Sequence, residues 1–418
     1  MKARVVITGL GIVSPIGIGV KEFWKAALEG RSGVTAIRSF DPFPLEGYRS
    51  RVAAQVENFS LRQHLDLPQG DRVDRYAQFA LVAAGEALAD SGLRIEKEDA
   101  HRVGVMMGAG MGGMVMGERE VTQLYQRLKP HRVHPNFIPA ITLNSASGIL
   151  AMTYGAKGPN LTISTACSSS AHALGQALNC IRSGQADAVI TAGADASITP
   201  LAFAGFCSLR VLSTKFNETP AKASRPFDRM RDGFVMGEGA GALILESLSH
   251  ARKRKARIYA EVAGYAATSE AYHLVIPRED GVEIAETIRL ALKDAGHTPR
   301  EVDYINAHAT STPVGDNVEI RGLRQVFKSR AENLAINATK SLIGHTLGAA
   351  GAIGGIATAL SIDTGRIHPT INYDEPDPEC RLPGISRSVQ ERRVKVALVN
   401  SFGFGSNNAA LVFRNPSL

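Results

Sequence analysis

The segment 160–192, NLTISTACSSSAHALGQALNCIRSGQADAVITA, indicates the fold class of this chain. It opens with a short β-branched run at 160–164, continues through small residues into an alanine- and leucine-rich stretch at 170–182, and closes with an apolar run at 188–192. The two runs have the length of buried strands, and the leucines between them recur on one face of a helix. A strand, a helix and a second strand in this order predict an α/β protein.

The same alternation continues on both sides of this segment. We expect further strands at 4–7, 103–107, 258–263, 302–307, 334–337, 394–400 and 409–413, and further helices at 77–91, 281–295 and 348–362. Strands and helices alternate in a similar way in the N-terminal and C-terminal parts of the chain, which favours an internal duplication into residues 1–255 and 256–418. The basic cluster 251–257 at this boundary has the composition of a solvated helix end.

Composition excludes several classes of protein. The 418 residues are 44% hydrophobic and 21% charged, as in ordinary globular proteins. The formal net charge is +7, but no basic run is interleaved with aromatic residues, so we expect no nucleic-acid partner. Because no uncharged apolar stretch reaches about 18 residues and the N-terminus lacks a leader pattern, we also expect no membrane span and a cytoplasmic location.

Cys167 is the candidate nucleophile. Its thiol would lie at a strand-to-helix turn, where the amides and dipole of the helix start favour the reactive thiolate. The alternative is a small buried residue in a tight turn, which is the interpretation we favour for Cys180 and Cys207. With Cys380, the cysteines show no C-x-x-C spacing, so the sequence predicts neither a metal site nor a disulfide framework.

Two histidines, His308 and His345, have unusual neighbours. His308 follows the apolar run 302–307, at the carboxyl end of a predicted strand, where α/β folds place functional residues. His345 precedes the small residues 348–351, which permit close backbone packing around it. Either could instead be a structural histidine with satisfied hydrogen bonds, which is our interpretation of the other histidines.

Two glycine-rich segments complete the candidates. GAGMGG at 108–113 follows a predicted strand and superficially matches a dinucleotide fingerprint, but residues 114–117 do not begin a convincing phosphate-binding helix. NSFGFGSNN at 400–408 alternates aromatic residues and glycine, as does a loop that places an apolar side chain and still moves. A buried hairpin turn is the alternative.

Four ordered motifs carry a family resemblance: TACSS at 165–169, NAHATSTP at 306–313, TKSLIGH at 339–345 and NSFGFG at 400–405. They resemble the β-ketoacyl-acyl-carrier-protein synthases, most closely the elongating synthase II type. The likeness extends from ITGLG at 7–11 to the end of the chain. It implies the thiolase fold, a five-layered α-β-α-β-α sandwich of two similar α/β halves, and usually a homodimer.

The resemblance also implies a chemistry. The chain would be an acyltransferase that condenses an acyl thioester with malonyl-acyl carrier protein in fatty-acid elongation. Cys167 would carry the acyl group, and the backbone amides of Cys167 and Phe404 would hold the oxyanion. After malonyl decarboxylation, neutral His308 and His345 would stabilise the enolate oxygen, with Lys340 as a further catalytic position. This reaction needs no metal or redox cofactor, so none is expected.

Further positions match substrate and carrier contacts of the family. They are Thr310 and Thr312 toward the phosphopantetheine arm, Met111 and Phe206 in the acyl tunnel, Phe404 at the gate, and Phe402 as a further substrate-binding position. Arg72 and Arg210 are candidate docking contacts for the acidic acyl carrier protein, where opposite charge raises the encounter rate.

The chain departs from the family pattern at three places. They are Gly354 where many members have glutamate, Ala309 where glycine is usual, and Gly405-Ser406-Asn407 in place of Gly-Gly-Thr. Lys340 would then depend on Asp316 or Glu319. Gly354 and the segment CSSS at 167–170 also favour an alternative, a ketosynthase of a type II polyketide or polyene pathway, which could pair with a chain-length-factor subunit in a heterodimer.

Other members of the same superfamily fit the motifs less well. A thiolase would need a second cysteine in the C-terminal loop, where this chain has Phe404. A priming synthase typically has asparagine at the position of His345. A chain-length factor lacks the cysteine that this chain has at 167.

Overall fold

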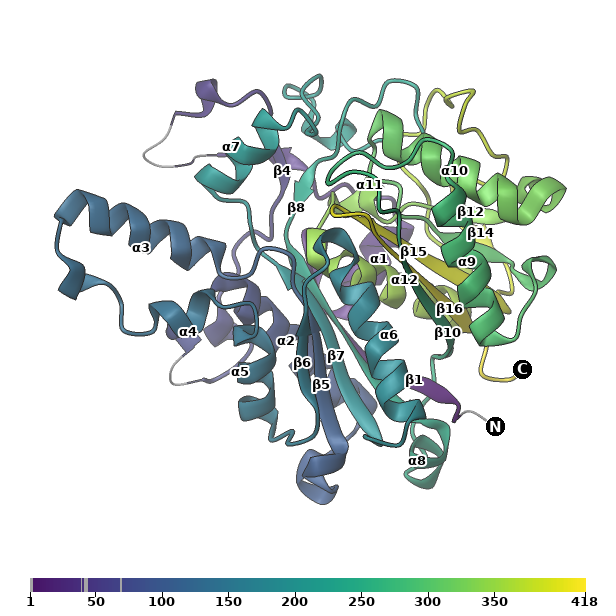
Figure 1. Ribbon diagram of the computed structural model, residues 1–418, viewed down its shortest axis with the longest axis horizontal. Coiled ribbons are helices and arrows are strands. Elements are labelled where there is room, and N and C mark those ends of the chain that lie inside the picture. The colour runs from purple at the N-terminus through teal and green to yellow at the C-terminus, as the bar shows by residue number, and fades with distance from the viewer. Residues whose placement is uncertain (1–2, 39, 41–43, 68–69) are drawn as a thin grey trace.

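The computed structural model describes residues 3–38, 40, 44–67 and 70–418. Its centre is an 11-stranded sheet (Figure 1). The N-terminal half has the strand order β6 (Asn160–Ile163), β5 (Val103–Gly108), β7 (Ala188–Asp195), β9 (Gly239–Ser247), β1 (Val5–Ser14). The C-terminal half repeats it as β12 (Ala335–Asn337), β11 (Tyr304–Asn306), β15 (Val396–Gly403), β16 (Asn407–Arg414), β10 (Ala260–Ser269). The internal duplication that the sequence suggested is therefore visible in the topology.

The two halves share a strand pattern as well as an order. In each, parallel strands β6, β5, β7 or β12, β11, β15 are followed by two antiparallel strands. Strand β1 pairs with β10 through Val6 opposite Glu261 and Ile7 opposite Ala260, and this short contact joins the halves edge to edge. The short strand β2 (Gly17–Ile18) extends β1.

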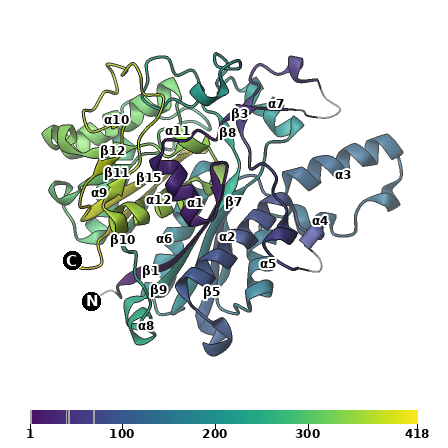
Figure 2. The same ribbon diagram turned by 180° about the vertical axis from the view of Figure 1, so that it is seen from behind.

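Helices complete five layers (Figures 1 and 2). Helix α2 (Arg75–Ser91) covers β1, β9 and β7 on one outer face, and α9 (Val282–Ala295), backed by α10 (Pro313–Phe327), covers β10 and β16 on the other. Helices α6 (Ser169–Arg182) and α12 (Ala350–Thr364) pack on each other between the halves and contact strands of both. The predicted five-layered α-β-α-β-α sandwich is confirmed.

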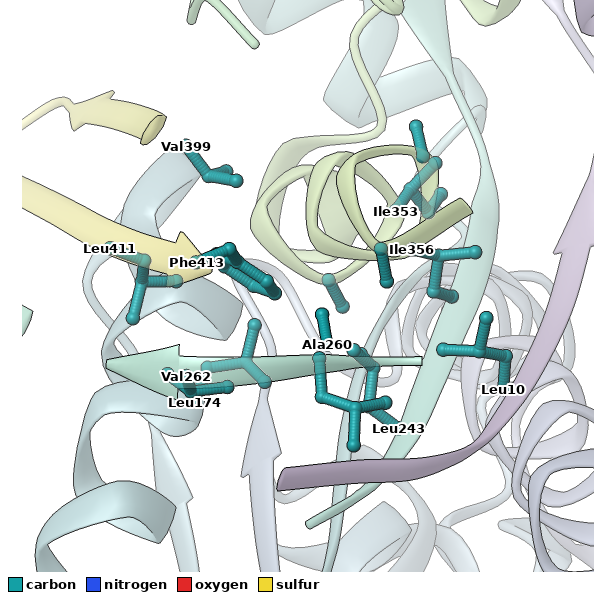
Figure 3. Close-up of a cluster of buried hydrophobic side chains, with 14 of the residues drawn as sticks. Leu10, Leu174, Leu243, Ala260, Val262, Ile353, Ile356, Val399, Leu411 and Phe413 are labelled. Carbon is teal, nitrogen blue, oxygen red and sulfur yellow. The ribbon is translucent and has the colours of Figure 1, made fainter. Parts of the chain in front are cut away.

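Helix α12 forms the centre of the core. Its residues Ile353 and Ile356 pack with Leu243 of β9, Leu10 of β1 and Phe413 of β16 (Figure 3). Full burial of each such side chain stabilises the fold by about 1.5–3 kcal/mol. A helix apolar on every side belongs in a core or a membrane. The segment Leu347–Thr364 is long and apolar enough to cross a bilayer, but 83% of it is buried inside this fold, as for a core helix.

The remaining elements surround this frame. The helices are α1 (Val20–Leu28), α3 (Met114–Arg127), α4 (Phe137–Ile141), α5 (Ser145–Tyr154), α7 (Pro200–Ser208), α8 (Leu248–Lys253) and α11 (Lys340–Ile343). A small sheet contains β3 (Thr35–Ala36), β4 (Val52–Ala54) and β8 (Met236–Gly237), and β13 (Arg366–Ile367) pairs with β14 (Gln390–Glu391).

The sequence predicted every strand of the main sheet except β9 and the short β2. Helix α3 begins at Met114, directly after the glycine-rich segment 108–113; that this segment is not a phosphate-binding site stays a prediction. The basic cluster 251–257 includes the exposed end of α8, as expected. The boundary between residues 1–255 and 256–418 falls just after this helix and stays a prediction.

Candidate active site

Cys167 lies in the 3-10 turn Ala166–Ser168, which leads directly into α6. The turn is tight: Ala166 adopts a left-handed conformation with φ of 51°. Gly403 packs against it so closely that an added Cβ would lie 2.6 Å from the Thr165 carbonyl oxygen, which only glycine tolerates. Ser168 Oγ donates a hydrogen bond of 2.9 Å to the Asn407 carbonyl. The nucleophile turn and the β15–β16 hairpin are therefore packed as one unit.

Burial is the largest influence on the pKa of the Cys167 thiol. Cys167 is only 8% exposed, and burial raises the pKa of its thiol to about 11. The charge of Lys340 and the backbone N–H groups of Phe404 and Cys167 itself act in the opposite direction. The backbone amide of the turn thus favours the thiolate, as expected, but desolvation is the larger effect and keeps the thiol protonated in the resting protein. The two amides nevertheless face the sulfur, as an oxyanion site at this position requires.

His345 has a fixed backbone and a defined tautomer. Its N–H donates to the Val235 carbonyl and its carbonyl accepts from Gly237 N–H. The backbone N–H of Leu347 donates to His345 Nδ1 at 3.3 Å. Since Nδ1 acts as an acceptor, the proton of the neutral ring lies on Nε2. This Nε2 is buried and has no hydrogen-bond partner among the described residues, so it is available to a substrate.

His308 follows β11, and its ring centroid lies 5.5 Å from that of His345 with the planes nearly perpendicular. The aromatic rings of Phe402 and Phe234 pack against His308 and His345, respectively. Burial, reinforced by the charge of Lys340, lowers the pKa of both histidines well below 6.5. Both rings are therefore neutral at pH 7, and a neutral imidazole can donate one hydrogen bond.

Lys340 is also buried, with only 7% of its surface exposed. Burial lowers its pKa to about 8, and Glu319 is the largest opposing influence. Glu319 accepts hydrogen bonds from the backbone N–H groups of His308 and Ala309 and from the Asn400 amide. Of the two carboxylates suggested by the sequence, Glu319 thus acts more strongly on Lys340 than Asp316 does.

Gly354 lies in α12. An added Cβ there would lie 3.0 Å from Asn306 Oδ1. The Asn306 amide donates to Thr339 and Asn337, in a buried polar network without a charged side chain. The position at which many family members have glutamate is thus next to neutral amide groups in this chain.

A cavity of about 360 Å³ collects most of the predicted residues. Its lining includes Cys167, His308, His345, Met111, Phe206, Phe402, Phe404, Thr310, Thr312 and Arg210. Lys340 is not at its surface and acts through its charge. Arg72 ends the turn Gly70–Arg72, is exposed, and does not line the cavity. The roles assigned to all of these residues stay predictions.

The hairpin between β15 and β16 forms part of the cavity wall, so the hairpin alternative for residues 400–408 describes its shape. Its tip is bonded to the loop after β10: Gly405 N–H donates to the Leu274 carbonyl at 2.7 Å, and Ser406 Oγ to the His273 carbonyl at 3.0 Å. Ser406 has a φ of 64°, a conformation rare outside glycine. This contact between the two loops has no signal in the sequence.

Asp195 was also missed. It ends β7, is fully buried, and accepts hydrogen bonds from the backbone N–H groups of Gly110 in the N-terminal half and Gly348 in the C-terminal half. A carboxylate closing an otherwise apolar strand was an available signal, but its partners are distant in the chain.

Comparison with known proteins identifies the family. Residues 2–251 match the β-ketoacyl synthase N-terminal domain and residues 259–374 the β-ketoacyl synthase C-terminal domain. The chain belongs to the β-ketoacyl synthase family. Within this family it is 45% identical over 416 residues to 3-oxoacyl-[acyl-carrier-protein] synthase 2 of Synechocystis, covering 99% of this chain and 98% of that protein. The protein of the same name from Staphylococcus aureus strain COL is 44% identical over 411 residues, covering 98% of each.

Solved synthase structures agree with the fold. A type II polyketide synthase acyl carrier protein in complex with its hexaketide-bound ketosynthase matches with a TM-score of 0.92 at 37% identity, covering 99% of both chains. A β-ketoacyl synthase from Burkholderia phymatum matches with a TM-score of 0.91 at 32% identity, covering 99% of this chain and all of that one. The described residues contain no group of three or more His, Cys, Asp or Glu side chains placed to hold a metal ion. The absence of a cofactor stays a prediction.

Proposed function

We propose that this β-ketoacyl synthase catalyses the decarboxylative condensation of an acyl thioester with malonyl-acyl carrier protein, giving a 3-oxoacyl-acyl carrier protein in cytoplasmic fatty-acid elongation. The observation that carries the proposal is the convergence of Cys167, His308 and His345 on one cavity, where His345 Nε2 has no hydrogen-bond partner among the residues that the structure describes. The names of the relatives at 44–45% identity support the assignment to elongation.

The first half-reaction loads Cys167. Its sulfur attacks the carbonyl carbon of the acyl thioester, and the carbonyl oxygen becomes an oxyanion held by the amides of Cys167 and Phe404. When the intermediate collapses, the bond to the carrier sulfur breaks. The proton of the Cys167 thiol ends on the departing carrier thiol, so the exchange is balanced without an external base.

The second half-reaction forms the new carbon–carbon bond. The malonyl carboxylate leaves as carbon dioxide, and its bonding electrons form an enolate on the thioester. His345 Nε2–H and the His308 imidazole donate hydrogen bonds to the enolate oxygen in a site shielded from water. The enolate carbon attacks the acyl carbon on Cys167, the bond between that carbon and the Cys167 sulfur breaks, and the released thiolate takes up a proton from solvent when the product leaves. Neutral imidazoles suit this step because they need no reprotonation between turnovers.

Dimerisation is supported by an uncovered sheet edge. In the C-terminal half the edge strand β12 is buried, and Ile336 bridges to Ile385. The equivalent strand β6 leaves Leu161 exposed, and neighbouring α5 and α4 expose Met152 and Ile138 (Figure 1). We assign this face to a second copy of the chain. Sedimentation of a Leu161→Arg variant as a monomer would support this assignment, whereas an unchanged mass would contradict it.

The carrier protein would dock at the mouth of the cavity. Arg210 is exposed and lines this mouth, and Arg72 adds positive charge elsewhere on the surface. The solved ketosynthase complex with an acyl carrier protein supports such a partner. The phosphopantetheine arm would then pass Thr310 and Thr312, whose hydroxyls lie 3.0 Å apart.

A condensation assay with purified acyl and malonyl carrier proteins tests the function. Wild type should extend the acyl chain by two carbons, and Cys167→Ala should not. Normal turnover in Cys167→Ala would overturn the proposal. A ladder of acyl carrier substrates separates elongation from the polyketide alternative. That alternative is supported by a further solved structure, the ishigamide ketosynthase/chain length factor, which matches this chain with a TM-score of 0.90 at 35% identity. Repeated extension without reduction of the product would favour that alternative, as would activity only with a sister subunit.

A further inference from the structure

Asp195 joins the two halves of the protein beside the nucleophile. Its side chain is fully buried at the end of β7. Oδ1 accepts from Met111 N–H at 2.9 Å, and Oδ2 accepts from Gly110 N–H at 2.9 Å and from Gly348 N–H at 2.6 Å. No basic side chain forms an ion pair with it in the described part of the chain. The carboxylate is therefore held by backbone amides of two loops.

These loops carry two parts of the proposed reaction. Met111 lines the cavity on the acyl side. Gly348 follows Leu347, whose N–H donates to His345 Nδ1 and thereby places the ring proton on Nε2. Leu347 holds a φ of 49°, a left-handed conformation that is unfavourable for leucine and persists only where its surroundings impose it.

The backbone is closely packed around the Asp195 carboxylate. An added Cβ on Gly348 would lie 2.4 Å from the Gly110 nitrogen and 2.6 Å from Asp195 Oδ2. Two backbones therefore meet at the carboxylate, and no side chain separates them. Only an acceptor with two oxygens can receive all of these N–H groups at once. The charge also raises the pKa of the Cys167 thiol, an effect that a merely space-filling side chain would avoid.

We infer that Asp195 is a positioning residue for the malonyl half-reaction: by holding Gly348 it maintains the left-handed Leu347 and so presents His345 Nε2–H to the enolate oxygen. The inference rests on the proposed function. It predicts that a substitution of Asp195 slows malonyl decarboxylation but not acyl loading, because loading of Cys167 uses the Cys167 and Phe404 amides and does not require the His345 tautomer.

The variant Asp195→Asn tests whether the two half-reactions are affected differently. Asparagine keeps the size but removes the negative charge that strengthens every hydrogen bond to Asp195, and replaces one of the two acceptor oxygens by an NH₂ donor, so the three N–H groups can no longer all be accepted. We expect carbon dioxide release from malonyl carrier protein to fall by roughly tenfold or more, with the KM for that substrate nearly unchanged. Acyl loading of Cys167 in a single turnover should remain within about threefold of wild type. Equal losses in both half-reactions, or no loss in decarboxylation, would overturn the inference.

Asp74→Asn is the matched control. Asp74 is also a buried carboxylate that accepts backbone N–H groups, those of Tyr76 and Met116, and it lies outside the cavity lining. It should lose thermal stability without a selective loss of decarboxylation. A selective loss in this control would mean that any buried carboxylate has the effect, which would also overturn the inference.

A measurement on the wild type covers the case in which Asp195→Asn does not fold. Nitrogen NMR of ¹⁵N-histidine protein, with His345 assigned by its absence in His345→Gln, should show the Nε2–H tautomer. An Nδ1–H tautomer would refute the inference directly. Absence of condensation by wild type would instead refute the proposed function, so the two failures are distinguishable.

Discussion

Replacement of His308 by alanine should separate the two half-reactions. His308 is 7% exposed, and no other described residue pairs with its Nδ1. Its ring is neutral because burial lowers its pKa. In the proposed mechanism it supplies one of two side-chain hydrogen bonds to the enolate oxygen. Removal of one preorganised donor from an oxyanion site costs about 3 kcal/mol, or about 10²–10³ in rate. Water entering the space left by the ring would moderate the loss toward the lower figure.

The assay measures the half-reactions separately. Carbon dioxide release from malonyl carrier protein should fall by about 10² in His308→Ala. Acyl transfer to Cys167, followed by mass spectrometry in a single turnover, should persist, because the amides of Cys167 and Phe404 hold that oxyanion. His172→Ala is the control, since His172 is a buried histidine whose pKa burial lowers to about 4 but which lies outside the cavity lining. Unchanged carbon dioxide release in His308→Ala, or the same loss in His172→Ala, would refute the reasoning.

Three further predictions address the gate, the carrier and pH. Ser406→Ala removes the hydrogen bond to the His273 carbonyl, worth about 1 kcal/mol, so hydrogen exchange of the backbone amides at the hairpin tip should accelerate about fivefold. Unchanged exchange would mean that the Ser406 hydroxyl does not stabilise the tip. Arg210→Glu should slow association with the acyl carrier protein and flatten its salt dependence in stopped-flow experiments, with little change in turnover at saturation; an unaltered salt slope would exclude Arg210 from docking. The hydrogen bond to Glu246 raises the pKa of His250 above 6.5, so its stabilisation is complete below pH 6.5 and is lost as pH rises through the raised value. The difference in unfolding free energy between wild type and His250→Gln should therefore shrink with rising pH, and a difference that grows would contradict this sign.

The sequence was most informative where function depends on local motifs. Cys167, His308 and His345 each lie at the end of an apolar run or among small residues, and the structure brings all three to one cavity. The repeated alternation likewise predicted the two halves. Strand β9 was missed because its glycines and alanines, GAGALILES, blur the pattern of a strand.

Properties that depend on distant neighbours could not be predicted. The direction of the thiol pKa shift follows from the burial of Cys167, which no short motif indicates. The three N–H groups on Asp195 come from Gly110, Met111 and Gly348, and only the assembled halves bring them together. The bonds between the 400–408 hairpin and the loop after β10 are similarly invisible in the sequence.

Peptide mapping of the acyl-enzyme tests the central claim most directly. The protein is incubated with an acyl carrier thioester in the absence of malonyl carrier protein, then digested and analysed by tandem mass spectrometry. The account predicts a single acyl adduct on the sulfur of Cys167 that disappears when malonyl carrier protein is added. An adduct on Cys207, or turnover without any adduct at position 167, would contradict it.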